Sequence, residues 1–169
     1  LVEAIKTKKR ELAETNIFSK VTFDALGAKE IQRLFRATKT SIKRKIRIEK
    51  LVTIPSIENV SASYLGVLPH EEFFKLITDE TGELVKTVFV DNVRDFQGEN
   101  PVNADIAKTI SEGWLDQFVL RNNGVTIVAK GIKVTSSNYT LEDYQIVNGC
   151  QTSHVLYANR ALITGDLFV

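Results

Sequence analysis

The spacing of apolar and polar residues predicts helices and strands in mixed order along the chain. Apolar residues recur every three or four positions in five segments, which we expect to be helices. These helices lie at residues 2–14, after Gly27, from Pro69 to about residue 79, from Asn103 to about Trp114, and from Asn148 to about Gly165. Runs rich in β-branched residues predict strands at residues 21–23, 43–54, 60–68, 85–90, 125–134 and 139–147.

Turn and cap residues mark the boundaries of several of these elements. Ser136-Ser137-Asn138 joins the last two strands and predicts a hairpin. Asn148 and Gln151 have the spacing of N-cap and N3 in a variant capping box. Mixed element order with a hairpin favours an α+β fold with a mixed, mostly antiparallel sheet and helices packed to one side.

The charge of the chain is divided unevenly along its 169 residues. Residues 1–50 carry 14 Lys and Arg against 6 Asp and Glu, whereas residues 51–169 carry 8 against 15. We therefore expect a basic helical segment at residues 1–40, linking to an upstream domain, and an α+β domain at residues 41–169. The basic segment would contact nucleic-acid phosphates, or it would pack on an acidic protein surface.

The composition predicts a cytoplasmic protein without a membrane segment. No apolar run approaches the roughly 20 residues of a membrane helix, and the charged start of the chain does not resemble a signal peptide. The single cysteine, Cys150, cannot form an internal disulfide. The absence of methionine indicates a piece of a longer polypeptide.

Two Asn/Gly turns carry polar residues where a core would have apolar ones. The first reads Asn122-Asn123-Gly124, and the second reads Asn148-Gly149-Cys150-Gln151-Thr152 at a strand-to-helix junction. Helix N-termini present free N–H groups that bind anions. Each turn alone is also explained by ordinary turn and capping chemistry.

Asn92-Val93-Arg94 follows the apolar run at residues 85–90. Arginine binds phosphate or carboxylate through two oxygens at once, so Arg94 is a candidate ligand clamp. The other interpretation is a salt bridge with Asp91, Asp95 or Glu99. Those acids lack metal-ligand spacing and a histidine, so no metal site is predicted.

Cys150 and His154 are a candidate nucleophile pair, because residues four apart share a helix face. Nothing in the sequence orients the histidine, so we favour a buried structural cysteine. The chain contains no Gly-x-Gly-x-x-Gly and no Walker loop, and no cofactor is expected. No catalytic residue is assigned.

Four motifs occur in order between residues 85 and 160: Phe89-x-x-Asn92-Val93-Arg94-x-Phe96-x-Gly98, Val102-Asn103-x-x-Ile106-x-x-Thr109, Phe118-x-x-x-Asn122-Asn123-Gly124-Val125-Thr126-Ile127 and Gln145-Ile146-Val147-Asn148-Gly149-x-Gln151-Thr152. With these motifs, residues 85–160 resemble the AIPR family, the abortive infection phage resistance proteins of bacteria and archaea.

The resemblance implies a cytoplasmic antiphage role for an AIPR-like domain at residues 41–169. Many members also begin with a nuclease-like domain, whose carboxylate–lysine motif this chain lacks. If such a domain exists here, the full-length protein could be a nuclease, although the fragment is not expected to be an enzyme.

Two hypotheses for the motifs follow. In the first, one polar pocket binds nucleic acid or a nucleotide, by weak analogy with ParB-like domains. In the second, the same residues form a buried hydrogen-bond network in a structural or protein-interaction module. The pocket would be built from Asn92, Arg94, Asn122, Asn123, Asn148, Gln151 and Thr152.

Overall fold

The computed structural model describes residues 2–15, 27–28, 31, 41–92 and 96–169. The chain divides into two compact units, residues 1–40 and 41–169. In the first unit, helix α1 (Val2–Glu14) is confirmed as expected. The strand expected at residues 21–23, and most of the helix expected after Gly27, lie outside the described residues.

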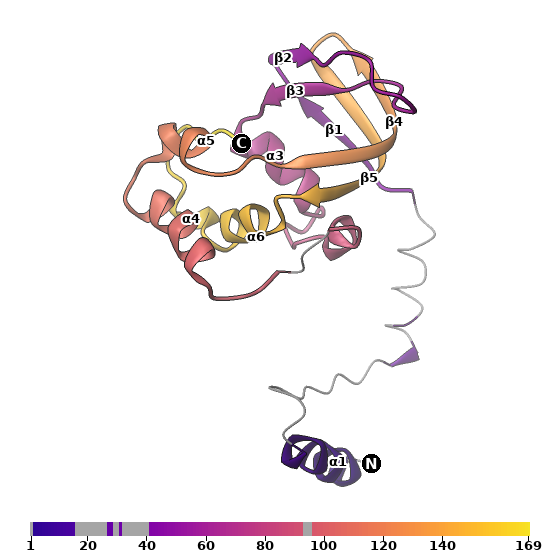
Figure 1. Cartoon of the computed structure of the whole chain (residues 1–169), viewed down its shortest axis with the longest axis vertical. Coiled ribbons are helices and arrows are strands. Elements are labelled where there is room, and N and C mark those ends of the chain that lie inside the picture. Colours follow the sequence, from indigo (N-terminus) through magenta and orange to yellow (C-terminus); the bar gives the residue numbers. More distant parts are fainter. Residues whose placement is uncertain (1, 16–26, 29–30, 32–40, 93–95) are drawn as a thin grey trace. The chain divides into compact units, whose positions relative to one another are not determined.

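The second unit contains a three-stranded antiparallel sheet in the order β1-β5-β4 (Figure 1). Its strands are β1 (Lys43–Arg47), β4 (Thr126–Thr135) and β5 (Asn138–Asn148). The predicted hairpin is correct, and Ser136 at its turn has a φ of 56°. With the helices, this sheet confirms the α+β class.

The predicted single strand at residues 43–54 is wrong, because the chain changes sheets within it. β1 ends at Arg47, and β2 (Lys50–Thr53) pairs with β3 (Tyr64–Val67) in a separate two-stranded sheet. The alternation of apolar residues continues through the break. Periodicity alone therefore could not reveal the change of partner.

The predicted strand at residues 85–90 is also wrong. It is a 3-10 turn, η1 (Lys86–Phe89), that buries Val88 and Phe89. A short apolar run has no periodicity that separates a strand from a buried turn.

The segment that contains η1 covers the edge of β5 beyond the end of β1. β1 pairs with β5 only as far as Glu142. Beyond that point, the Gln145 side chain donates to the carbonyl of Thr87 (3.0 Å), and the Asn92 side chain donates to the carbonyl of Ile146 (3.0 Å). The Asn92 amide thus satisfies a backbone carbonyl of β5, and the Gln145 amide joins β5 to a carbonyl of η1.

The helices of this unit gather below and beside the sheet (Figure 1), and α3 packs against β1. Tyr144 of β5 donates to the carbonyl of Leu76 in α3 (2.6 Å), and burial raises the pKa of Tyr144 to about 12. The elements are α3 (His70–Ile77), α4 (Pro101–Ser111), η2 (Leu115–Gln117), α5 (Phe118–Arg121), α6 (Cys150–Ala158) and η3 (Arg160–Leu162).

Several expected helix boundaries shift, and α6 ends at Ala158 rather than near Gly165. Pro69 is the N-cap of α3, not its first residue. Asn100, rather than Asn103, caps α4, because the Asn100 side chain accepts from the Asn103 N–H and Pro101 takes the first helical position. Trp114 lies beyond the end of α4, which stops at Ser111.

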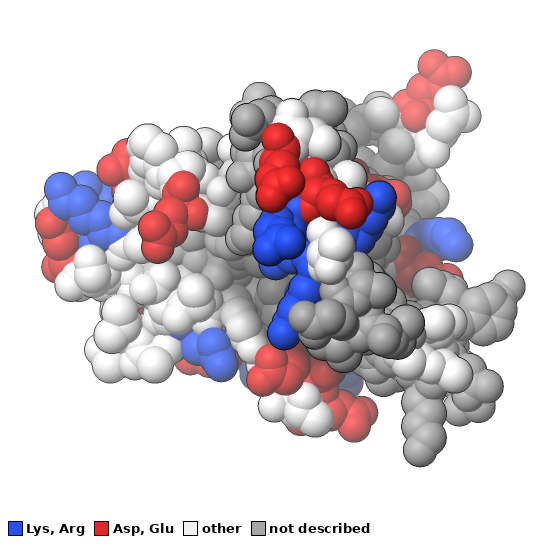
Figure 2. Space-filling model, turned by 90° about the horizontal axis from the view of Figure 1, so that it is seen from below, with Lys and Arg blue, Asp and Glu red and all other residues white. Residues whose placement is uncertain are grey.

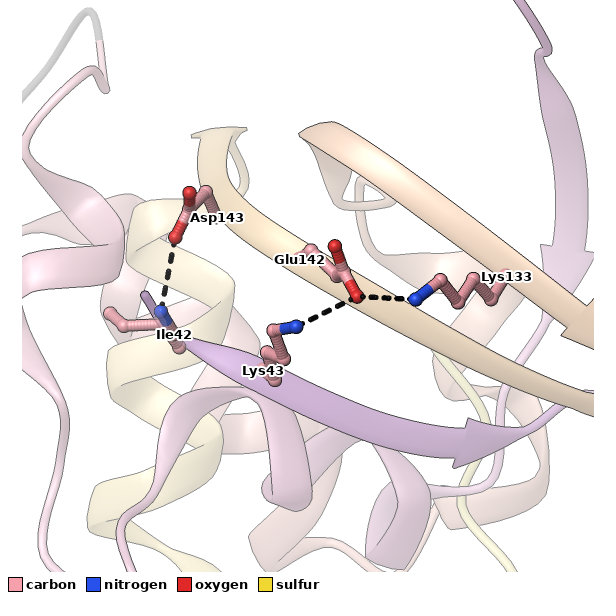
Figure 3. Close-up of polar contacts among 5 residues, drawn as sticks. All are labelled: Ile42, Lys43, Lys133, Glu142 and Asp143. Carbon is pink, nitrogen blue, oxygen red and sulfur yellow. Dashed lines mark hydrogen bonds and ion pairs between the residues drawn. The ribbon is translucent and has the colours of Figure 1, made fainter. Parts of the chain in front are cut away.

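Much of the described basic charge has acidic neighbours. Glu142 of β5 accepts from Lys43 of β1 (3.0 Å) and lies 3.3 Å from Lys133 of β4 (Figure 3). Within α1, Lys8 pairs with Glu11 at 2.9 Å. The charges on the face in Figure 2 accordingly lie in small mixed groups. These pairs engage part of the described basic charge within the chain itself.

Candidate functional site

The junction of β5 and α6 is built by a glycine. Gly149 is the N-cap of α6, with a φ of 95° in the left-handed region. The predicted Asn148–Gln151 capping box is therefore wrong. Asn148 is the last residue of β5, pairs with Thr126, and makes no side-chain cap. Left-handed backbone favours glycine, so the turn places Gly149 at the cap and leaves Asn148 in the strand.

Gly149 also brings the two Asn/Gly turns together. A Cβ at Gly149 would stand 2.7 Å from Cγ2 of Val125 and 3.0 Å from its Cα. Val125 directly follows the first turn. The hydroxyl of Thr152 lies 3.5 Å from the carbonyl of Asn123, in the same turn. The close approach of two backbones thus unites motifs that are separate in the sequence.

The first turn ends helix α5 through Asn122. Its backbone N–H and its side-chain amide both donate to the carbonyl of Phe118, at 3.1 and 3.0 Å. Asn123 and Gly124 are exposed. The amide group of Asn122 therefore terminates the helix, whereas Asn123 is available at the surface.

A cleft of about 510 Å³ opens between these turns and α4. It is lined by six of the seven residues predicted to form a pocket, while Arg94 lies outside the described residues. The predicted six are Asn92, Asn122, Asn123, Asn148, Gln151 and Thr152, and the other lining residues are Val102, Asp105, Ile106, Arg121, Val147, Gly149 and Cys150. The residues are gathered as expected; that they bind a ligand stays a prediction.

Arg121 is a cleft residue that the sequence interpretation left out. Its guanidinium carbon lies 3.8 Å from the centre of the Trp114 ring, and its Nε donates to the side chain of Gln117 (3.0 Å). These two contacts hold a positive charge in place without neutralising it. In the sequence, the four-residue spacing of Gln117 and Arg121 indicates that their side chains can contact each other on a helix face.

Asp105 is the second charged residue of the cleft that the sequence did not predict to lie there. It lies on α4 and lines the cleft together with Val102 and Ile106. Helical spacing puts the three residues on one face, with Ile106 buried in the core and Asp105 exposed. The cleft therefore has one wall with a carboxylate and another with a guanidinium.

The Cys150–His154 pair does not have the geometry of an activated thiol. Cys150 Sγ lies 3.5 Å from His154 Nδ1, but the same nitrogen lies 2.9 Å from the carbonyl of Cys150. A carbonyl only accepts, so Nδ1 carries the proton and cannot take one from the thiol. The ring stacks on Phe96 at 4.5 Å, and burial lowers the pKa of His154.

The acidic residues near Asp91 likewise form no metal site in the described segments. Among residues 41–92 and 96–169, no three His, Cys, Asp or Glu side chains come together as metal ligands would. Within the described parts of the chain, no helix has the length and apolar character to span a membrane.

The comparison with known families identifies this region. Residues 89–167 match the family model described as AIPR protein. This region belongs to the AIPR family. No curated protein and no solved structure matches the chain. The AIPR match contains every residue that lines the cleft, whereas β1, β2, β3 and α3 lie outside it. The cleft is thus a feature of the AIPR region itself.

Proposed function

We propose that the AIPR region binds nucleic acid or a nucleotide in the cleft between its two Asn/Gly turns. Membership of the AIPR family supports a role in abortive infection or phage resistance. Binding or sensing of a nucleic-acid component would be the contribution of this region to that role.

The fixed guanidinium of Arg121 is the observation that carries the proposal. Arginine binds phosphate oxygens through its planar fork, and an arginine already held in place loses less freedom on binding. Asn123 and Asn148 line the same cleft, and both are exposed. An amide offers both donors and an acceptor, as recognition of a base edge requires.

A structural role is the second candidate, and specific contacts favour it for part of the motif set. The amides of Asn92 and Asn122 donate to backbone carbonyls, and Thr152 lies near the carbonyl of Asn123. Asn92 and Thr152 contact separate segments of the chain, and Asn122 ends α5. The two candidates are compatible because they assign different residues: the network positions the walls, and Asn123, Asn148 and Arg121 face the ligand.

Fluorescence anisotropy tests the binding proposal with labelled single-stranded DNA, single-stranded RNA, duplex DNA and adenine nucleotides. We expect at least one probe to bind, with an affinity that falls as salt rises. Arg121→Gln should weaken this binding at least about tenfold, since charge-assisted hydrogen bonds contribute roughly 1.5–3 kcal/mol.

Arg160→Gln is the matched control. Arg160 also stacks on an aromatic ring, with its guanidinium carbon 4.1 Å from the centre of Tyr157, but it does not line the cleft. It should bind as wild type does. Failure of every probe, or equal binding by the Arg121→Gln variant, would overturn the proposal.

We also propose a wider context for this region. An upstream nuclease-like domain would act on the signal from this region, in the cytoplasm, with residues 1–40 as the link. The full reading frame tests this directly. A carboxylate–lysine nuclease motif before Leu1 is expected, and an upstream region without it would contradict the arrangement.

A further inference from the structure

The cleft has two opposite charges on different walls, and they do not neutralise each other. Arg121 comes from α5 and Asp105 from α4, and both line the cavity. Across the described residues, the ion pairs within 4.0 Å include neither side chain. Both charges are therefore open to a ligand.

We infer that the cleft selects one nucleotide unit with a single phosphate, which meets Arg121, and a hydroxyl or amino donor, which meets Asp105. This inference rests on the proposed nucleotide or nucleic-acid binding. It narrows that proposal to a monophosphate unit, either a free mononucleotide or one nucleotide of a single strand.

The balance of charge argues against a polyphosphate. The cleft is lined by one cationic and one anionic side chain among its described residues. The N-terminus of α6 adds only about half a positive charge. A triphosphate would bring several further negative charges close to the Asp105 carboxylate. Duplex DNA is disfavoured for the related reason that its binding needs several cations along two backbones.

The size and lining of the cleft suit a single nucleotide. Its volume of about 510 Å³ lies in the range of small-molecule sites, roughly 300–1,000 Å³. Val102, Ile106 and Val147 supply apolar wall for a base or sugar, and the amides of Asn123 and Asn148 supply donors and acceptors. This mixture is typical of sites that orient one small ligand.

Asp105 sets the chemistry of the second contact. An ionised carboxylate only accepts hydrogen bonds, so its ligand group must be a donor. In an adenine nucleotide, the available donors are the ribose hydroxyls and the exocyclic amine of the base. Both satisfy the same requirement, and different probes distinguish them.

Calorimetric titration at about 0.15 M salt, a physiological ionic strength, tests the inference with AMP, ATP, dAMP and IMP. We expect AMP to bind at least tenfold more tightly than ATP. Weaker binding of dAMP would assign the Asp105 contact to the ribose 2′-hydroxyl. Weaker binding of IMP would assign it to the exocyclic amine. Equal or tighter binding of ATP would overturn the inference.

Asp105→Asn identifies the residue responsible. We expect it to reduce the preference for AMP over ATP at least fivefold, because the repulsion of extra phosphates is removed. Asp116→Asn is the matched control, an exposed acid in η2 that does not line the cleft. An unchanged preference in a folded Asp105→Asn variant, confirmed by thermal unfolding, would contradict the role of Asp105.

Failure of the inference can be separated from failure of the proposed function. If oligonucleotides bind in an Arg121-dependent manner but discrimination by Asp105 is absent, the inference fails and the proposed function stands. If no nucleotide and no oligonucleotide binds, both fail.

Discussion

The turn at residues 122–124 and the turn at residues 148–149 combine the same two amino acids and border the same cleft. In the first, the amide of Asn122 holds the carbonyl of Phe118, and a Cβ on Gly124 would meet nothing within 4 Å. In the second, Gly149 has a positive φ and touches Val125, while Asn148 makes no cap. Asparagine thus stabilises one turn, and glycine makes the other possible.

This difference separates structural residues from candidate ligand residues within one sequence pattern. Asn122 is engaged with backbone, whereas Asn148 is exposed at the cleft. Identical residue types in similar turns therefore do not have identical roles. The roles of the two asparagines follow only from the backbone geometry around each turn.

Replacement of the two glycines by alanine should give the largest contrast. Gly149→Ala should lower the free energy of unfolding by about 3 kcal/mol, from left-handed backbone and collision with Val125. Gly124→Ala should be neutral or stabilise by up to about 1 kcal/mol, because the site has space and the unfolded chain loses freedom. Urea unfolding measures both, and equal effects would remove the distinction between the turns.

A double-mutant cycle with Val125→Ala sharpens this result. The atom closest to the added Cβ is Val125 Cγ2, at 2.7 Å, which the second substitution removes. We expect partial rescue, so that the double variant is more stable than the sum of the single effects predicts. Rescue should stay incomplete, because the Val125 Cα at 3.0 Å and the positive φ remain.

The two asparagines should show the reverse order with a smaller effect. Asn122→Ala should cost about 1 kcal/mol, the usual contribution of one hydrogen bond. Asn148→Ala should change the free energy of unfolding by less than about 0.5 kcal/mol, as exposed substitutions commonly do. Thermal unfolding monitored by circular dichroism compares them. A larger effect for Asn148 would mean that the second turn also depends on its asparagine.

Acidification should affect the helix that the second turn starts. Burial lowers the pKa of His154 in the folded state, so the unfolded chain binds a proton first. His154 therefore makes its full contribution to the free energy of unfolding above about pH 6.5, which is the pKa of histidine in the unfolded chain. This contribution declines as the pH falls below that value. Urea unfolding from pH 8 to pH 5 should show the decline. The His154→Gln variant should lack the share of the decline that His154 causes.

The sequence predicted those parts of the fold whose signals are local. The hairpin of β4 and β5 was correct because alternating residues flank a short polar turn. Six of the residues predicted to form a pocket line one cleft, and the turn before β4 meets the turn after β5 because these two strands are antiparallel. The cap at Gly149 was not predicted, and neither was its close approach to Val125, which is distant in the sequence.

The other errors also arose from tertiary context. The run at residues 85–90 is a turn that side-chain amides join to the free edge of β5, and a short apolar run does not reveal such contacts. The run at residues 43–54 was divided between two sheets. Arg121 was not singled out, because its fixed position requires Trp114 and Gln117 around it.

The pairing of β1 with β5 has a consequence for how the chain acquires its structure during synthesis. The Ile42 N–H bonds to the Asp143 side chain across 101 residues of sequence (Figure 3). At roughly 5–20 residues per second, the ribosome needs about 5–20 seconds to make that interval. Throughout this time β1 lacks its strand partner, β5. During that time the strand is solvated through its basic side chains, Lys43, Arg44, Lys45 and Arg47. Their like charges also oppose association between the unpaired strands of two nascent chains.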